Sequence, residues 1–328
     1  MMDRKHSMKK ILITGAAGHI GSALTSALCQ KARYFVVAVD NLSTGSLSKL
    51  PNPRTNRYRF IKADVNDFRE VSTIFLNNDF DYIFHFAAVV GVQRTLANPL
   101  LVLNDIEGFK NILSLSKNCG VQRVFFSSSS EVYGEPVSLP QNEETTPLNS
   151  RLPYAIVKNI GESYFKSYFT EHGLPYTIFR IFNTYGPNQS TDFVIPRFVE
   201  SAIKNENITI YGDGLQSRTF CYIDDNVEAM IAIFEGDHFI NDVVNIGSDI
   251  EISILDLAKL IIKLTGSSSS IVHLPALKEG DMPRRSPDIT KMRSVLMREH
   301  ITLEEGINLL LKHKSTDPKL KIGIKLKK

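Results

Sequence analysis

The first half of the chain alternates short apolar runs with stretches in which apolar residues recur at helical spacing. The apolar runs predict strands at 11–14, 35–40, 59–63, 82–87 and 123–127. The longest helical patterns cover 100–119 and 153–172, and a further strand is predicted at 176–182. Near-continuous apolar strands separated by helices are typical of a parallel sheet covered on both faces. The pattern therefore predicts an α/β fold, a doubly wound parallel sheet of the Rossmann type.

After Asn183 the rhythm changes to loops rich in Gly, Pro and Asn, with helical patterns at 194–205 and 254–265. The run 243–246 predicts a strand that returns to the main sheet. A chain of 328 residues is long enough for one large domain and a smaller lobe. We therefore expect a Rossmann domain at 8–182 with a return at 225–247, a smaller α/β substrate lobe at 183–224 and 248–312, and flexible tails at 1–7 and 313–328.

Charge gives no sign of a nucleic-acid partner. The formal net charge is only +3, and the excess of Lys and Arg lies mainly at the two ends of the chain. Solvated tails explain such an excess better than a nucleic-acid arm does. The apolar run behind the basic start breaks at once into Thr14-Gly15-Ala16-Ala17-Gly18, which fits neither a signal segment nor a membrane span. We expect no membrane partner.

The three cysteines, Cys29, Cys119 and Cys221, are scattered and lack CxxC spacing. An odd number of isolated cysteines argues against a disulfide framework and against a zinc site. We therefore expect no metal, buried structural thiols, and a reducing compartment such as the cytoplasm.

The segment 11–22, ILITGAAGHIGS, predicts a strand, a glycine-rich turn and the start of a helix. Gly15 allows the tight turn, Gly18 lets the backbone approach a pyrophosphate, and Gly21 allows close packing of the helix on the strand. The helix N-terminus presents unpaired N–H groups and the positive end of its dipole to phosphates. The turn, spaced GxxGxxG, is a candidate dinucleotide site, although glycines in such a turn can also serve packing alone.

An acidic residue ends the second predicted strand and strengthens this interpretation. Asp40 follows the turn by about twenty residues, where a carboxylate accepts hydrogen bonds from a ribose diol and repels a 2′-phosphate. This placement favours NAD over NADP, and the alternative role for Asp40 is a cap or turn residue. Asp64 and Val65, after the third strand, are candidates to border the adenine, where Asp64 could equally cap a helix.

Tyr154 and Lys158 lie four residues apart in a predicted helix and therefore on one face of it. There the Lys158 ammonium can stabilise the Tyr154 phenolate, which lets the phenol act as a base toward a hydroxyl group. The pair follows a serine-rich strand end, 127–130, and α/β sheets present their chemistry at the carboxyl ends of strands.

Together these features resemble the extended short-chain dehydrogenases/reductases that act on nucleoside-diphosphate sugars, the NAD-dependent epimerase/dehydratase family. The resemblance runs from Lys9 to about Leu311. It is carried by TGAAGHIGS, VDNLSTG (39–45), HFAA (85–88), SSSSEVYGEP (127–136), YAIVK (154–158), RIFNTYGP (180–187), IYGDGLQSRTFCYIDD (210–225) and GDMPRRSPDI (280–289).

The resemblance implies a role for each matching residue. Ser129 would share a hydrogen bond with the reacting hydroxyl, Tyr154 would remove its proton, and hydride would pass from the sugar to NAD. Asn183, Arg218 and Arg285 would meet the sugar or its diphosphate, since Arg binds phosphate oxygens in bidentate fashion. Tyr154 and Lys158 would also contact the cofactor, together with His19, Ile20, Asn41, Ala87 and Ala88. The implied partners are a UDP-sugar, or another nucleoside-diphosphate sugar, as substrate and a second copy of the chain in a homodimer. The implied biological role is in polysaccharide biosynthesis.

The residues after Ser129 bear on the reaction. In 4,6-dehydratases an Asp-Glu pair stands here as acid and base, whereas this chain has Ser130-Glu131 and lacks the proton donor for the departing hydroxyl. Ser-Glu followed by Val-Tyr-Gly resembles the UDP-glucuronate decarboxylases instead, as does the segment around Arg285. We therefore expect Glu131 to lie near the reacting centre of a decarboxylase that forms a 4-keto intermediate.

Two features favour the alternative, a UDP-sugar 4-epimerase. Ser129 stands where decarboxylases usually carry Thr, and 193–198, with Arg197, resembles the substrate loop of 4-epimerases. The sequence places decarboxylation slightly ahead of epimerisation, and both well ahead of dehydration. A regulator that binds NAD without turnover ranks last, because the chain keeps both Tyr154 and Lys158.

Overall fold

The computed structural model describes residues 8–52, 55–276 and 284–316. Within these ranges the chain divides into two compact units. The first comprises 8–134, 148–180 and 230–244, and the second comprises 135–147, 181–229 and 245–316.

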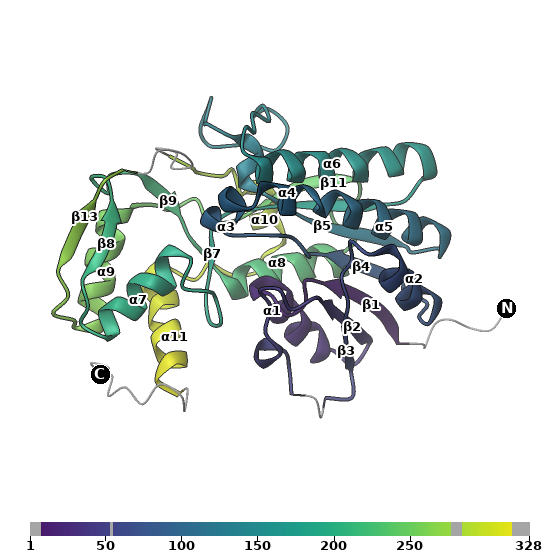
Figure 1. The fold of residues 1–328 in the computed structure, drawn as a ribbon, viewed down its shortest axis with the longest axis horizontal. Helices are drawn as coiled ribbons and strands as arrows, with labels where there is room; N and C mark the ends of the chain where they lie inside the picture. The colour runs from purple at the N-terminus through teal and green to yellow at the C-terminus, as the bar shows by residue number, and fades with distance from the viewer. Residues whose placement is uncertain (1–7, 53–54, 277–283, 317–328) are drawn as a thin grey trace. The chain divides into compact units, whose positions relative to one another are not determined.

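Seven strands of the described residues form one sheet in the order β3-β2-β1-β4-β5-β6-β11 (Figure 1). They are β1 (Lys9–Thr14), β2 (Tyr34–Asp40), β3 (Tyr58–Lys62), β4 (Tyr82–His85), β5 (Arg123–Ser129), β6 (Tyr176–Ile181) and β11 (Asp242–Ile246). The pairs from β3 across to β5 run parallel. The strand order reverses between β1 and β4, and open α/β sheets bind ligands at the carboxyl ends of strands at such a switch point. The doubly wound fold predicted from the sequence is confirmed.

Helices of the first unit supply the apolar layers that cover this sheet. They are α1 (His19–Cys29), α2 (Phe68–Leu76), α3 (Val92–Ala97), α4 (Pro99–Leu103), α5 (Asp105–Asn118) and α6 (Pro153–His172), with short 3-10 turns η2 (Leu47–Lys49) and η3 (Ser130–Tyr133). Leu12, Ile83 and Phe126 share a buried cluster with residues of α2, α5 and α6. Phe84 and Phe125 instead contact Phe234 of α8 (Ile223–Glu235). Because successive side chains of a strand point to opposite faces, the sheet is buried on both.

The helix that carries Tyr154 and Lys158 has its predicted bounds, 153–172. Pro153 occupies its first turn, where the missing N–H costs nothing. Gly173 ends it in the left-handed conformation, with φ 68°, and its N–H bonds to the carbonyl of Phe169. Proline and glycine thus mark the two ends, and α6 lies alongside α5 (Figure 1).

Two predicted helices differ in the structure. The single helix expected over 100–119 is divided at Asn104 into α4 and α5, and the side chain of Asp105 turns inward to accept a hydrogen bond from the N–H of Val89. The helix expected over 194–205 is α7 (Val194–Ile203), which ends earlier because Asn205 adopts a left-handed φ of 55°.

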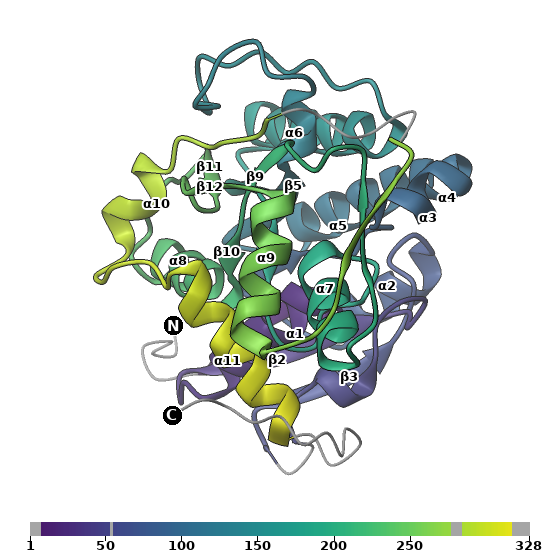
Figure 2. The same cartoon turned by 90° about the vertical axis from the view of Figure 1, so that its left-hand side faces the viewer.

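The second unit is built from short paired strands and helices. Strand β8 (Ile208–Tyr211) runs parallel to β13 (Ile271–Leu274), β7 (Thr184–Tyr185) parallel to β10 (Cys221–Tyr222), and β9 (Ser217–Thr219) antiparallel to β12 (Glu251–Ser253). Helix α9 (Ile254–Thr265) packs beside α7 and α11 (Leu303–Thr316), as Figure 2 shows, and α10 (Thr290–Val295) precedes α11.

The units differ from the expected boundaries in three places. Residues 135–147 belong to the second unit, where Gln141 forms a bridge with Pro287, and the segment returned to the first unit is 230–244. Helix α11 continues to Thr316, into the stretch expected to be a tail from 313. The other tail residues, 1–7 and 317–328, lie outside the described residues. None of the helices in the described ranges combines the length and apolar character needed to cross a membrane.

The glycine turn yields a prediction about stability. A Cβ atom at Gly21 would lie 2.2 Å from the carbonyl oxygen of Gly15, whereas one at Gly18 would lie 3.1 Å from the same atom. We expect Gly21→Ala to destabilise the protein by about 1–3 kcal/mol, the usual cost of overpacking, and Gly18→Ala by less. Thermal unfolding of both variants measures this difference.

Gly120→Ala is the control, because a Cβ there meets nothing within 4 Å and only the left-handed φ of 70° is strained. Equal melting temperatures for the Gly21 and Gly18 variants would contradict the packing explanation.

Candidate active site

The turn after β1 approaches the chain that follows β4. Gly15 has a left-handed φ of 67°, and a Cβ there would lie 2.7 Å from backbone atoms of Phe86 and Ala87. Gly18 caps α1 without a side-chain hydrogen bond, and no acidic residue stands in the first turn of the helix. His19, Ile20 and Gly21 form that turn, where backbone N–H groups gather at the positive end of the dipole. This end of α1 suits an anionic group.

Thr14 fastens the end of β4 to the end of β1. Its hydroxyl oxygen accepts hydrogen bonds from the N–H groups of Phe86 (3.1 Å) and Ala87 (3.2 Å) and lies 2.8 Å from Nδ1 of His85. Ala87 and Ala88 are half-buried at this edge. The glycine turn and the predicted HFAA segment are therefore brought together at the switch point.

Asp40 joins the same edge from β2. Its carboxylate accepts hydrogen bonds from the N–H groups of Ala17 (2.9 Å) and Leu42 (2.8 Å), and the residue is only 8% exposed. The turn role considered as an alternative is thus present. A carboxylate has about four acceptor positions, so two backbone donors leave capacity for a ribose diol.

The turn after β3 is organised by Asp64. Its carboxylate accepts hydrogen bonds from the N–H of Asn66 (2.9 Å) and from the side chain of Asn41 (3.1 Å). Val65 lies in the core behind it. Asp64 therefore has the contacts of a turn residue, and Asn41 is tied to it.

The catalytic candidates lie on β5, η3 and α6. Lys158 is 2% exposed, and its Nζ donates a hydrogen bond of 2.6 Å to the carbonyl of Ser127 at the end of β5. The same Nζ lies 5.8 Å from the centre of the Tyr154 ring. Two residues beyond Ser127, the Ser129 hydroxyl accepts a bond from the N–H of Glu131 (3.2 Å). The structure thus brings Lys158 close to Tyr154 and to the strand end that bears Ser129.

Burial shapes the charge of Lys158. Its pKa falls to about 8, because the buried ammonium loses its hydration, while the negative charge of Asp105 acts in the opposite direction. Asp105 is itself buried, and desolvation raises the pKa of its carboxyl group. Sequence reasoning missed this carboxylate, although its spacing from Phe109 and Ile112 places an acid on the apolar face of α5.

His85 is a structural residue rather than an acid or base. It is fully buried, and desolvation, helped by the charge of Lys158, lowers its pKa to about 3. The imidazole is therefore neutral at any ordinary pH. Its ring lies against those of Phe109 and Phe126.

The serine-rich strand end has three distinct environments. The Ser127 carbonyl binds Lys158, the Ser128 hydroxyl donates a 2.6 Å hydrogen bond to Glu162, and Ser130 begins η3 as a buried residue. Glu162 in turn pairs with Arg180 at 2.8 Å. Glu162 and Arg180 were not predicted as site residues, although Glu162 follows Lys158 at the spacing of one helical turn.

The substrate candidates belong to the second unit. The side chain of Asn183 donates to the Thr219 carbonyl (3.0 Å), and Arg218 on β9 donates to the carbonyl of Ser217 (2.7 Å). Arg197 lies on α7, with its guanidinium 5.7 Å from the Phe198 ring. Arg285 is buried, and its neighbour Arg284 forms a bidentate pair with Glu251. Residues 280–283 of the GDMPRRSPDI segment lie outside the described residues.

Among the described residues, neither the cysteines nor a cluster of metal-ligating side chains provides a further candidate site. The three cysteines form no disulfide. Cys29 and Cys221 are buried as expected, whereas Cys119 is exposed at the end of α5, so the expectation of a buried thiol is wrong there. Within the described ranges no cluster of three or more His, Cys, Asp or Glu side chains has the arrangement of a metal site.

Known proteins resemble the chain over most of its length. Residues 11–247 match the model of the NAD dependent epimerase/dehydratase family. The UDP-N-acetyl-alpha-D-glucosaminuronate decarboxylase of Bacillus cytotoxicus is 37% identical over 315 residues, which cover 91% of this chain and 95% of that protein. UDP-glucuronic acid decarboxylase 6 of Arabidopsis thaliana is 33% identical, with coverage of 97% and 91%.

A solved structure gives the same assignment. The UDP-glucose 4-epimerase of Thermotoga maritima, determined with UDP-glucose, superposes with a TM-score of 0.87 at 33% identity, covering 93% of this chain and 98% of that one. The glycine turn, Asp40 and the Tyr154–Lys158 pair lie in the region that the family model matches. The chain therefore belongs to the NAD-dependent epimerase/dehydratase family, and it is an enzyme that uses NAD.

Proposed function

We propose that the protein decarboxylates a UDP-linked uronic acid, either UDP-glucuronate or its 2-acetamido counterpart, through a 4-keto sugar. The observation that carries this proposal is the η3 turn, in which Ser129 is followed by a buried Ser130 and then by Glu131. The likeness to two uronate decarboxylases supports it. The product would be a UDP-pentose, a sugar donor for polysaccharide biosynthesis, made in the cytoplasm.

The edge formed by β1, β2 and β4 fits NAD. The N-terminus of α1 would receive the pyrophosphate, and Asp40 would accept hydrogen bonds from the adenosine ribose. Asn41, Asp64 and Val65 would border the adenine, and Ala87 and Ala88 would line the opposite side. When bound, NAD accepts a hydride from the sugar and later returns it.

We assign the proton transfer to Tyr154, assisted by Lys158 and Ser129. Tyr154 takes the proton of the 4-hydroxyl group while the charged Lys158 ammonium stabilises the phenolate. Ser129 donates a hydrogen bond to the same sugar oxygen and so holds it against Tyr154. The C4–H bond is then free to give up its hydride, and a 4-keto sugar results.

A 4-keto uronate is a β-keto acid and can lose carbon dioxide. The bond between C5 and the carboxylate carbon breaks, CO₂ leaves, and the electron pair remains on C5 as an enolate shared with the O4 oxygen. The Tyr154 phenol and Ser129 hydroxyl then stabilise O4, and a proton adds to C5. Glu131, whose backbone N–H bonds to the Ser129 hydroxyl, is the residue proposed to direct this reprotonation.

Dehydration needs a different group at 130. A departing hydroxyl must be protonated, and the buried Ser130 hydroxyl is far too weak an acid to supply that proton.

Substrate binding would fall to residues of the second unit. The diphosphate and the sugar would be bound by Arg285, Arg218, Arg197 and Asn183, since Arg is suited to phosphate and carboxylate oxygens.

A 4-epimerase is the second candidate. The likeness to the Thermotoga maritima epimerase and the hydroxyl of Ser129, in place of the decarboxylases' usual Thr, favour it. An epimerase forms the same 4-keto sugar but rotates it before hydride returns. The two candidates therefore differ in the fate of C6.

The fate of C6 can be measured directly. Purified protein given UDP-glucuronate or UDP-N-acetylglucosaminuronate should release one CO₂ for each UDP-pentose formed, as measured by NMR of the nucleotide-sugar together with CO₂ detection. Interconversion of UDP-glucose and UDP-galactose without CO₂ release would instead establish the epimerase. Tyr154→Phe is the control, and we expect it to lose activity by about a hundredfold or more while it still binds NAD.

Lys158 should also impose a pH dependence. We expect kcat/KM to decline above about pH 8, where Lys158 loses its proton and no longer stabilises the phenolate. Asp105 raises the pKa of Lys158, so Asp105→Asn should move this alkaline limb to lower pH. The amide keeps the acceptor for the Val89 N–H, which preserves the local fold.

Asp79→Asn, which removes an exposed carboxylate elsewhere in the unit, should leave the pH profile unchanged. A profile for Asp105→Asn that coincides with the wild-type profile would refute the proposed coupling.

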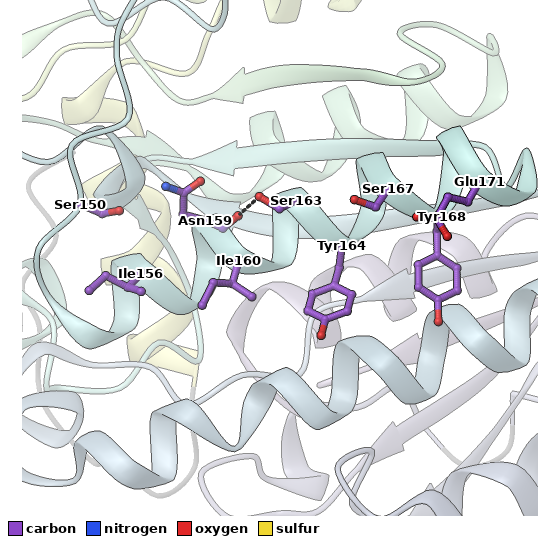
Figure 3. A pocket seen from close by; sticks show the side chains of 9 residues that line it. All are labelled: Ser150, Ile156, Asn159, Ile160, Ser163, Tyr164, Ser167, Tyr168 and Glu171. Carbon is purple, nitrogen blue, oxygen red and sulfur yellow. Dashed lines mark hydrogen bonds between the residues drawn. The ribbon is translucent and has the colours of Figure 1, made fainter.

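We also propose a homodimer. A groove of about 600 Å³ runs along α6. Three of the side chains that line it, Ile160, Tyr164 and Tyr168, point toward the neighbouring helix (Figure 3). Leu100 and Leu101 of α4 are 76% and 49% exposed, which is unusual for adjacent large apolar residues. An apolar helical face of this kind is suited to pairing with its own copy.

Light scattering at micromolar concentration should give twice the mass of one chain, and Leu101→Glu should shift the protein toward monomer. Leu309→Glu, at a 41% exposed leucine of α11, is the matched control and should remain dimeric. A monomeric wild-type protein would rule out the homodimer.

A further inference from the structure

A buried polar network lies beneath the catalytic candidates of the first unit. Oε1 of Glu162 accepts hydrogen bonds from the Ser128 hydroxyl (2.6 Å) and from Nε of Arg180 (2.9 Å), and Oε2 accepts one from Nη2 of Arg180 (2.8 Å). Glu162 and Arg180 are 1% and 2% exposed. The carboxylate and guanidinium thus form a bidentate pair inside the protein.

The network extends to η3 through Tyr133. Nη1 of Arg180 donates a hydrogen bond of 2.9 Å to the Tyr133 hydroxyl, and the guanidinium carbon lies 4.8 Å from the centre of the Tyr133 ring. Tyr133 is fully buried. Arg180 therefore contacts Tyr133, the last residue of η3, both through a hydrogen bond to the Tyr133 hydroxyl and through the Tyr133 ring.

These contacts bracket the catalytic turn. Ser128 precedes Ser129 by one residue, and Tyr133 follows Glu131 by two, so both ends of the turn are fastened to the same ion pair. Tyr154, Lys158 and Glu162 follow one another at intervals of four residues and share one face of α6. The network consequently links the segment bearing Ser129 and Glu131 to the helix bearing Tyr154 and Lys158.

Stability alone gives little reason for such a pair. Taking two charges out of water costs about as much as their attraction returns, and well-packed apolar side chains often replace a buried pair without loss. A bidentate carboxylate–guanidinium contact does, however, fix the relative orientation of the elements that carry it. Orientation is what a reaction with several catalytic groups requires.

We propose that Ser128, Glu162, Arg180 and Tyr133 form a positioning unit that holds Ser129 and Glu131 in register with Tyr154 and Lys158. The catalytic part of this inference rests on the proposed function, because Ser129 acts there on the sugar hydroxyl. The structural part, the fastening of the turn to α6, does not.

Four variants, each lacking one hydroxyl group, separate positioning from general packing. Ser128→Ala and Tyr133→Phe each cut one connection and leave the Glu162–Arg180 pair intact. Ser116→Ala is the control for serine, because this buried hydroxyl bonds to the Ile112 carbonyl within α5. Tyr34→Phe is the control for tyrosine, because its hydroxyl bonds to Glu235 (3.1 Å) away from the catalytic turn.

Hydrogen–deuterium exchange tests the inference without any substrate. In Ser128→Ala and Tyr133→Phe, amides of peptides covering 129–134 should exchange about tenfold faster, as expected when a hydrogen bond that restrains them is lost. The same peptides should be unchanged in the two controls, while all four variants melt within a few degrees of one another. Exchange at 129–134 no faster than in the controls would overturn the proposal, whatever the enzyme turns over.

Kinetics test the catalytic part on the nucleotide-sugar that the wild type converts. We expect kcat to fall by about ten- to a hundredfold in Ser128→Ala and Tyr133→Phe, with KM and bound NAD unchanged, because misplaced catalytic groups slow the chemistry and leave binding intact. Faster exchange with an unchanged kcat would refute the catalytic part alone. A wild type that converts no UDP-sugar would refute the proposed function and leave the exchange result to decide the inference.

Discussion

Lys158 donates its 2.6 Å hydrogen bond to the Ser127 carbonyl inside the protein, where an ammonium group has lost nearly all of its hydration. Burial of a charge is costly unless partners replace the water, and this chain supplies the carbonyl, the Tyr154 and Phe126 rings and the charge of Asp105. The same bond joins α6 to the end of β5. The residue proposed for the chemistry therefore also helps to fix the position of α6 against the sheet.

The edge of the sheet where we propose that NAD binds depends on close packing of backbone against backbone rather than on charge. Gly15 and Gly21 bring the turn against Ala87 and against itself at distances that no side chain would allow. Asp40 then uses two acceptor positions for the N–H groups of Ala17 and Leu42. Because the carboxylate is held by these backbone groups, it would already be oriented for the ribose that we propose it binds, which would lower the entropy lost on binding.

Short-range patterns in the sequence were sufficient to predict much of the fold. Pro153 and Gly173 mark α6 at both ends, and the apolar runs locate the strands of the sheet to within a few residues. Turn glycines and a YxxxK pair likewise predict a candidate site through short-range spacing. Spacing marks Asp105 as an acid on an apolar face, but it gives no partner for Asp105 or Arg180, because Val89 and Glu162 are 16 and 18 residues away in the chain. The break between α4 and α5 at Asn104 could not be predicted for the same reason, because it accompanies the hydrogen bond between Asp105 of α5 and the distant N–H of Val89.

A decarboxylase and an epimerase of this family would share these features, because both reactions need the same ketone. Forming that ketone takes a hydride acceptor, NAD, together with a phenol, an ammonium and a hydroxyl, and β5 and α6 would supply these three side-chain groups. The two reactions diverge at the ketone, which an epimerase rotates before hydride returns and from which a decarboxylase first removes CO₂ and then protonates C5. We assign that choice to the few side chains after Ser129. Because the glycine turn would serve both candidate reactions, Ser130 and Glu131 would distinguish them better than the glycine turn does.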